Sequence, residues 1–213
     1  MRRHTSRSSR VLPLMGNLLQ ATVSIQGTRP LLFNHLHPSP EFGQRQERSG
    51  TAGNDPTEWQ RSVLAVPETR QLYLLPSYLF GCLRDAGRFT KRNRGTLVSL
   101  IASTLILPER RILVDRYLPE APQFYSEEAD DLVYVFMSIT GGMSKKGSKN
   151  VRYRIAAASG WNCQFLLQWD KTIVSRNELE SVTIDAGKLV GLGDGRAIGY
   201  GRFEMVQFEV NPD

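Results

Sequence analysis

Apolar and polar residues alternate along much of this chain, with the period of two that is typical of half-buried β-strands. The clearest example is residues 19–26, LQATVSIQ, which alternate and are rich in β-branched residues. Similar patterns predict strands in five further segments, residues 70–76, 110–119, 130–142, 150–170 and 201–210. We expect these strands to form a mostly antiparallel sheet.

Helical spacing of apolar residues occurs in fewer places. It predicts helices in three segments, residues 56–65, 77–95 and 175–189. Ser77 is positioned to cap the second of these helices, and Ser175 with Glu178 forms a capping box at the start of the third. Residues 97–107 are apolar almost throughout, so their pattern fits a buried helix and a buried strand equally well.

The order of these elements predicts an α+β fold with helices on one side of the sheet. This order fits the RRM-like or ferredoxin-like class, which is built from a split βαβ arrangement. We expect residues 16–213 to form a single domain and residues 1–15 to form a flexible basic arm. Two insertions are expected in the domain, a long loop at residues 37–56 and a basic β-hairpin at residues 140–150.

Charge and composition narrow the class of partner. The 213 residues include 27 Lys and Arg against 21 Asp and Glu, and the net charge of +6 favours a polyanionic partner. No run approaches the about 18 apolar residues of a membrane span, and the expected compartment is the cytoplasm. Three histidines and two distant cysteines lack metal-ligand spacing, so no metal or cofactor is expected, and Cys82 and Cys163 are expected to be buried thiols.

The sharpest local feature is a run of five glycines between residues 191 and 201. Glycine lets backbone N–H groups approach an anion closely, so the run favours contact with phosphate. A dinucleotide cofactor does not fit, because its glycine motif follows a strand and opens a helix, whereas this run follows a helix and opens a strand. A plain helix-to-strand turn, with Gly191 as the helix cap, accounts for one or two of the glycines.

The segment LVGLGDGRAIGYGRFEMVQFEV, residues 189–210, resembles the glycine-rich loop and last strand of the RAMP superfamily, the RRM-like proteins of CRISPR effector complexes. Residues 21–34, ATVSIQGTRPLLFN, resemble the first strand and turn of the subunits that form the backbone of Cascade-type complexes. Small prophage proteins are similar as well. The chain is shorter than the larger backbone subunits, which leaves little room for their accessory subdomains.

This resemblance implies a subunit without catalytic activity that binds single-stranded guide RNA. Copies of the subunit would polymerise along the RNA beside other effector subunits, and each would insert a β-hairpin that kinks the strand. The guide would recognise the target nucleic acid by base pairing, while the protein recognises the backbone and the shape of the RNA.

Basic residues in three places are the candidates for RNA contact. They lie on the predicted helix 77–95 with its tail, on the hairpin, and in the glycine run. On the predicted helix, Arg84 and Arg88 have the i, i+4 spacing of one helical face. The full set of RNA-binding candidates is Arg84, Arg88, Lys91, Arg92, Arg94, Met143, Lys145, Lys146, Lys149, Arg152, Gly193, Gly195, Arg196, Gly199, Tyr200 and Arg202.

Few aromatic residues are expected to stack on bases. Met143 at the hairpin tip is expected to wedge between bases. Tyr200 and Phe203 would face opposite sides of the last strand, so at most one of them stacks and the other packs in the core. Trp161 and Trp169 are expected in the core or on a sheet face.

Two other functions are compatible with the sequence. His35 or His37 would act as a general base in a metal-independent endoribonuclease, as a histidine in this early region does in repeat-processing members of the superfamily. A phage-encoded protein that binds single-stranded nucleic acid without sequence preference would share the expected fold. The three functions predict, in turn, RNA-length-dependent multimers, cleavage to a cyclic phosphate, and binding to single-stranded DNA without ordered oligomers.

Overall fold

The computed structural model of the chain describes residues 16–35, 55–141 and 149–211. A five-stranded sheet with the order β10-β1-β9-β6-β3 forms its framework. Every pair of neighbouring strands in this sheet is antiparallel. The strands are β1 (Leu18–Gly27), β3 (Gln71–Leu74), β6 (Ile112–Tyr117), β9 (Asn162–Asp170) and β10 (Phe203–Val210).

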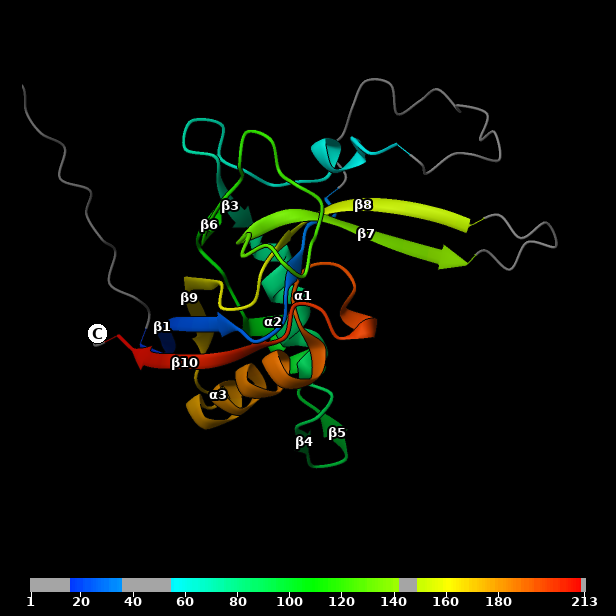
Figure 1. Cartoon of the computed structure of the whole chain (residues 1–213). Helices are drawn as coiled ribbons and strands as arrows, with labels where there is room; N and C mark the ends of the chain where they lie inside the picture. Colours follow the sequence, from blue (N-terminus) through cyan, green and yellow to red (C-terminus); the bar gives the residue numbers. More distant parts are fainter. Residues whose placement is uncertain (1–15, 36–54, 142–148, 212–213) are drawn as a thin grey trace, which may run out of the picture.

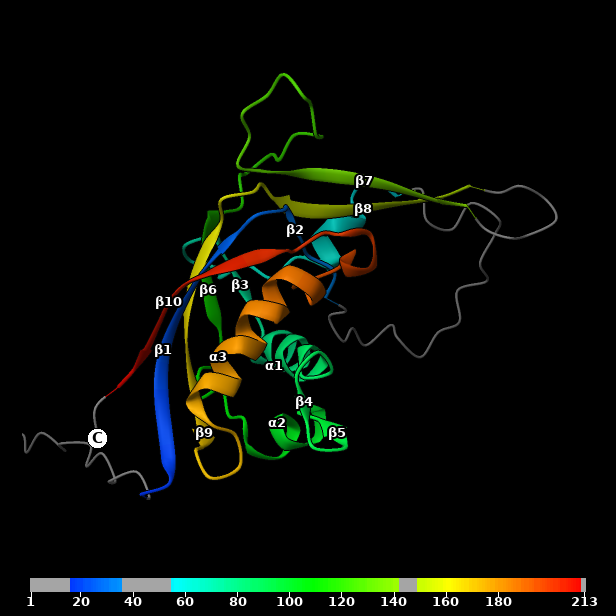
Figure 2. The same ribbon diagram turned by 90° about the horizontal axis from the view of Figure 1, so that it is seen from below.

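Three helices lie on one face of this sheet, as Figures 1 and 2 show. They are α1 (Pro76–Ala86), α2 (Val98–Thr104) and α3 (Arg176–Asp185). The elements β1, α1, β6, β9, α3 and β10 follow one another as the split βαβ units of a ferredoxin-like fold, and β3 extends the sheet beyond β6. The predicted α+β, RRM-like fold is therefore confirmed.

The core lies between the helices and the inner face of the sheet. Successive side chains of a strand point to opposite faces, so alternate residues of β1 are buried there, namely Ala21, Val23 and Ile25. Trp161 and Trp169 are fully buried, as the sequence predicts. Cys82 and Cys163 are free, buried thiols, also as predicted, and burial raises the pKa of Cys82 to about 12.

A second, three-stranded sheet consists of β2 (Leu31–Leu32), β8 (Lys149–Ala157) and β7 (Val133–Gly141), with β8 in the middle. Strands β7 and β8 form a hairpin between β6 and β9 in the chain, and this hairpin extends well beyond the helices (Figure 1). The predicted basic hairpin is therefore present, but its tip, residues 142–148, lies outside the described residues. The predicted arm at 1–15 and most of the predicted loop at 37–56 also lie outside them.

The helix predicted at residues 77–95 is wrong at both ends. α1 begins at Pro76, and Leu75 rather than Ser77 occupies its N-cap. Proline suits this first turn because the N–H that it lacks would have no helical partner there. The helix ends at Ala86, and after Gly87 the chain forms a small hairpin of β4 (Lys91–Arg92) and β5 (Gly95–Thr96).

The remaining predictions of local structure vary in outcome. The ambiguous residues 97–107 contain helix α2, and the helix predicted at 56–65 is a single 3-10 turn, Glu58–Arg61. The capping box of α3 is confirmed, since the Glu178 carboxylate accepts a hydrogen bond from the Ser175 N–H at 2.8 Å. α3 continues into a π-helical turn, Ala186–Val190, which Gly191 caps as predicted. Within the described residues, no helix is long and apolar enough to cross a membrane.

Candidate nucleic-acid interface

The glycine loop, residues 191–201, connects α3 with β10 and contains one 3-10 turn, Arg196–Ile198. Two backbone hydrogen bonds hold the loop against the segment that includes β2. The Asp194 N–H donates to the Leu32 carbonyl at 2.9 Å, and the Gly201 N–H donates to the Pro30 carbonyl at 2.8 Å. The loop therefore has a fixed position beside the second sheet.

Close packing inside the chain accounts for most glycines of this loop. Gly193 and Gly201 have φ angles of 70° and 67°, and a Cβ atom on them would overlap the carbonyl oxygens of Leu32 and Leu192. Among the glycines of this fully described loop, Gly199 alone has no heavy atom within 4 Å of the position of a Cβ, and its φ angle is 92°. Gly199 is therefore the glycine whose surroundings are open to a ligand.

The backbone N–H groups of the loop are mostly used within the chain. In seven residues the N–H donates to a carbonyl oxygen of the protein itself: Gly191, Leu192, Asp194, Ile198, Gly199, Tyr200 and Gly201. A donor that is already bonded is not available to an anion. Side chains, rather than the expected backbone cradle, are therefore the main groups that this loop offers to phosphate.

Three arginines meet where the C-terminal end of α1 approaches the glycine loop, and Arg84, Arg88 and Arg196 are called the arginine cluster below. Arg84 Nη2 lies 2.8 Å and Arg196 Nη1 lies 3.8 Å from the carboxylate of Asp85. Arg88 Nε donates to the backbone carbonyl of Asp85 at 2.7 Å. Because α1 ends at Ala86, Arg84 and Arg88 are not the predicted pair on one helical face. The cluster therefore sets two guanidinium groups against one carboxylate and a third against the backbone carbonyl of the same residue.

The other cations of the predicted helix tail lie elsewhere. Lys91, Arg92 and Arg94 belong to the β4–β5 hairpin, which projects at the opposite end of the molecule from the β7–β8 hairpin (Figure 1). Arg92 donates to the carbonyl of Ile173 and lies 3.6 Å from the carboxylate of Glu178. Arg92 therefore has a structural role at the start of α3.

The remaining arginines of the predicted set differ in their surroundings. Arg202 Nη2 donates to the Arg196 carbonyl at 3.4 Å, whereas Arg202 Nη1 is buried without a hydrogen-bond partner among the described residues. Arg152 binds the Glu58 carboxylate at 2.6 Å, which fixes the β7–β8 hairpin to the 3-10 turn at residues 58–61. Three hairpin candidates and the side chain of a fourth lie outside the described residues: Met143, Lys145, Lys146 and Lys149.

An aromatic groove lies where the β7–β8 hairpin, the glycine loop and the segment before β7 meet. Its volume is about 380 Å³, and its main lining residues are Arg29, Tyr125, Tyr134, Phe136, Ile198 and Tyr200. The rings of Tyr125 and Tyr134 are 5.0 Å apart, and those of Phe136 and Tyr200 are 5.2 Å apart. Of this set, only Tyr200 is among the residues predicted from the sequence to contact RNA. The alternation that places Tyr134 and Phe136 on one face of β7 is the signal that points to the groove.

Tyr200 and Phe203, which were expected to face opposite sides of the last strand, follow that expectation in part. Phe203 is buried in the core, as one member of the pair was expected to be. Tyr200 precedes β10, so the predicted alternation along that strand does not apply to it. Its position is set by the glycine loop instead, where its N–H donates to the Gly195 carbonyl at 3.2 Å.

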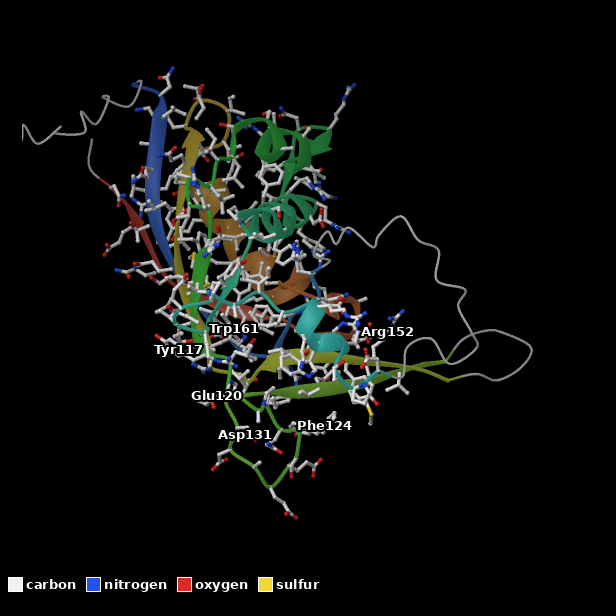
Figure 3. The ribbon with its side chains drawn as sticks, turned by 90° about the horizontal axis from the view of Figure 1, so that it is seen from above. Tyr117, Glu120, Phe124, Asp131, Arg152 and Trp161 are labelled. Carbon is white, nitrogen blue, oxygen red and sulfur yellow. The ribbon has the colours of Figure 1, made fainter. Side chains whose placement is uncertain are left out.

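The segment before β7, residues 118–132, contributes Tyr125 to the groove. The Tyr125 N–H donates to the Val135 carbonyl at 3.0 Å, so the segment runs beside β7. Figure 3 shows three residues of this segment on the side of the hairpin away from the helices, Glu120, Phe124 and Asp131. This segment therefore combines aromatic residues near the hairpin with carboxylates along its length, and the carboxylates of Asp130 and Asp131 line an adjoining hollow rather than the groove.

One of the two candidate histidines can be placed. His35 is half-buried, and its Nδ1 lies 3.1 Å from the hydroxyl of Tyr78. Burial raises the pKa of Tyr78, and the nearby carboxylate of Asp194 raises it further. His37 lies outside the described residues. Within the described part of the chain, no group of three or more His, Cys, Asp or Glu residues is arranged to hold a metal ion.

The uncovered face of the main sheet is a poor surface for nucleic acid. Its glutamines bond across the strands, as where Gln168 Nε2 donates to Gln20 Oε1 at 2.7 Å. The fully described strands β1, β9 and β10 contain no Lys or Arg, and Arg116 of β6 is only 9% exposed. Carboxylates on this face, including Asp115 and Glu204, would repel phosphate. Base stacking on the sheet, the usual mode of RRM domains, does not fit these residues.

Comparisons with known proteins give a likeness in fold. No family model matches the chain, and no curated protein matches it. A chain in the cryo-EM structure of the Type III-B Cmr-beta bound to cognate target RNA matches it with a TM-score of 0.51 and 13% sequence identity. The match covers 91% of this chain and 61% of the other, so this chain spans about three fifths of its length. At this identity, the likeness shows a shared fold.

Proposed function

We propose that this chain is a RAMP-type subunit of a CRISPR effector complex, and that copies of it line a single-stranded guide RNA. The observation that carries the proposal is the arginine cluster, because Arg196 of the glycine loop shares the Asp85 carboxylate with Arg84, while Arg88 binds the backbone carbonyl of the same residue. The fold shared with a chain of a Type III-B complex bound to target RNA supports it.

The chemistry of the cluster suits a phosphodiester backbone. Guanidinium groups are planar, permanently charged and able to donate two parallel hydrogen bonds to phosphate. The side chains of Arg84 and Arg196 are 45% and 41% exposed, so they can reach RNA without unfolding the protein. Contacts of this kind carry no sequence information, which leaves target recognition to base pairing by the guide. The proposed partners are therefore guide RNA, target nucleic acid, further copies of the chain and other effector subunits.

Binding of the full chain to single-stranded RNA tests this function. We expect RNA to bind with a log–log salt slope of about −2, because three phosphate contacts contribute about −0.7 each. Single-stranded DNA of the same sequence and duplex RNA serve as comparison ligands, and each should bind more weakly. The measurement is fluorescence anisotropy with labelled oligonucleotides across a salt series.

Other outcomes of this experiment would favour the other functions. Equal affinity for single-stranded DNA would favour a non-specific nucleic-acid-binding protein. Metal-independent cleavage that leaves a cyclic phosphate, and is lost when His35 and His37 are both replaced by alanine, would identify an endoribonuclease. No binding to any of the three ligands would refute the proposed function.

A further inference from the structure

The aromatic groove is open, and four of its eight lining residues are aromatic: Tyr125, Tyr134, Phe136 and Tyr200. Its volume of about 380 Å³ falls in the range of about 300–1,000 Å³ that is usual for ligand sites. The ring pairs are tilted, by 46° for Tyr125 with Tyr134 and by 60° for Phe136 with Tyr200. Tilted pairs leave ring faces available for a third flat group. Ile198, which is 73% exposed, adds an apolar surface at the rim.

Tyrosine hydroxyl groups and the side chain of Arg29 are the polar side-chain groups of the groove. Burial raises the pKa of Tyr134 to about 12, and the neighbouring Tyr125 and Tyr200 add to this rise. Neutral phenols can both donate and accept hydrogen bonds, as the edge of a nucleobase can. A groove with ring faces and neutral hydroxyl groups therefore suits a flat, polar-edged aromatic ligand.

Charge indicates where the phosphate of such a ligand would lie. The backbone of Arg29 is fixed at both ends, because its N–H donates to the Arg202 carbonyl at 3.2 Å and its carbonyl accepts from Trp161 Nε1 at 2.9 Å. Its exposed side chain lines the groove. An adjoining hollow of about 500 Å³ is lined by Asp130 and Asp131, whose carboxylates would repel a phosphodiester chain. A nucleic-acid backbone would thus pass the Arg29 side, with one base turned into the groove.

We propose that the aromatic groove binds a single unstacked nucleobase of single-stranded RNA, with the adjacent phosphate at Arg29. This inference rests on the proposed function and specifies how the RNA is held. The 3-10 turn Arg196–Ile198 connects the two parts of the site, since Arg196 belongs to the arginine cluster while Ile198 and the open Gly199 line the groove. Stacking in the groove accepts any base, because every base has an aromatic face.

The test compares single-stranded RNA with an abasic RNA of the same length, which keeps the phosphates and lacks the bases. The full chain should bind the base-bearing RNA about 10-fold more tightly, a factor at the lower end of the range for stacking of one base. Replacing Tyr125 and Tyr200 together by alanine should remove most of this preference and leave the salt slope unchanged. Replacing both by phenylalanine should retain the preference, because the rings remain.

Each result of this experiment decides something different. Equal affinity of the full chain for both RNAs, or a preference that survives the double alanine variant, would overturn the groove assignment and leave the proposed function standing. A double alanine variant that loses multimers but keeps the preference would assign the groove to a neighbouring protein copy, which also overturns it. No binding to either RNA would overturn the groove assignment and the proposed function together. Circular dichroism of the variants confirms that they fold.

Discussion

Replacing Arg84, Arg88 and Arg196 together by alanine is expected to weaken binding of single-stranded RNA about 100-fold at ~0.1 M salt. Each charge-assisted contact with phosphate contributes about 1 kcal/mol net, and three of them are removed together. The salt slope should become shallower by about 2 for the same reason. The fold should persist, because exposed ion pairs such as that of Arg84 with Asp85 contribute little to stability. The measurement is a salt titration of RNA affinity.

A matched control separates local contacts from the loss of overall charge. Arg110, Lys171 and Arg176 are exposed cations that lie outside the arginine cluster, and their triple alanine variant has the same reduced net charge. We expect this control to bind RNA within about 3-fold of the unaltered chain, since long-range charge is screened beyond about 10 Å at this salt concentration. Equal losses in the two variants would show that the cluster has no special role.

A variant of Asp85 tests the contact between the arginine cluster and phosphate through a gain in RNA affinity instead of a loss. Asp85 competes with phosphate for Arg84 and Arg196. The Asp85→Asn variant removes this negative charge and keeps the shape of the side chain. We expect RNA to bind several-fold more tightly, because removing a nearby negative charge favours phosphate binding by about 1 kcal/mol. Weaker binding by this variant would show that Asp85 positions the arginines instead of competing for them.

Replacing Gly201 by alanine is expected to lower the free energy of unfolding by about 3 kcal/mol, among the larger effects of a single substitution. The φ angle of 67° costs about 1 kcal/mol in any residue with a Cβ. The added methyl group would also overlap the carbonyl oxygen of Leu192, the residue whose N–H donates to the Gly201 carbonyl at 2.9 Å. Urea unfolding followed by circular dichroism measures the change.

Gly199→Ala is the matched control for this glycine. Its φ angle of 92° carries the same kind of backbone strain, but no heavy atom lies within 4 Å of the new Cβ. We expect a loss of about 1 kcal/mol for this variant. Equal losses at the two positions would mean that the overlap at Gly201 is relieved by a shift of the loop, and that the loop is less rigid than its hydrogen bonds indicate.

The fold was predictable because its signals are local in sequence. The alternation in β1 and β10 identifies two paired strands, and Ser175 with Glu178 marks the start of α3 within four residues. The end of α1 was missed because the apolar spacing extends past Ala86. The turn that follows contains Asn93 with a positive φ angle of 54°, and Gly95 stands two residues later. Asparagine and glycine are both turn residues, but the helical spacing outweighed this signal.

The candidate site was less predictable because it is assembled from distant segments. Arg84 and Arg196 are more than a hundred residues apart in the chain, yet they face the same carboxylate. The aromatic groove joins residues from four segments, and no local pattern links Arg29 with Tyr125 or Tyr200. The glycine run was recognised as unusual, but its sequence could not distinguish ligand contact from the close internal packing of Gly193 and Gly201.

Mass photometry of the full chain mixed with single-stranded RNAs of increasing length tests the proposed role most directly. A subunit that lines a guide RNA should add copies in discrete steps as the RNA becomes longer, and the complexes should dissociate when the RNA is digested. One copy per RNA at every length, or multimers that persist after digestion, would contradict the proposal that this chain assembles along a guide.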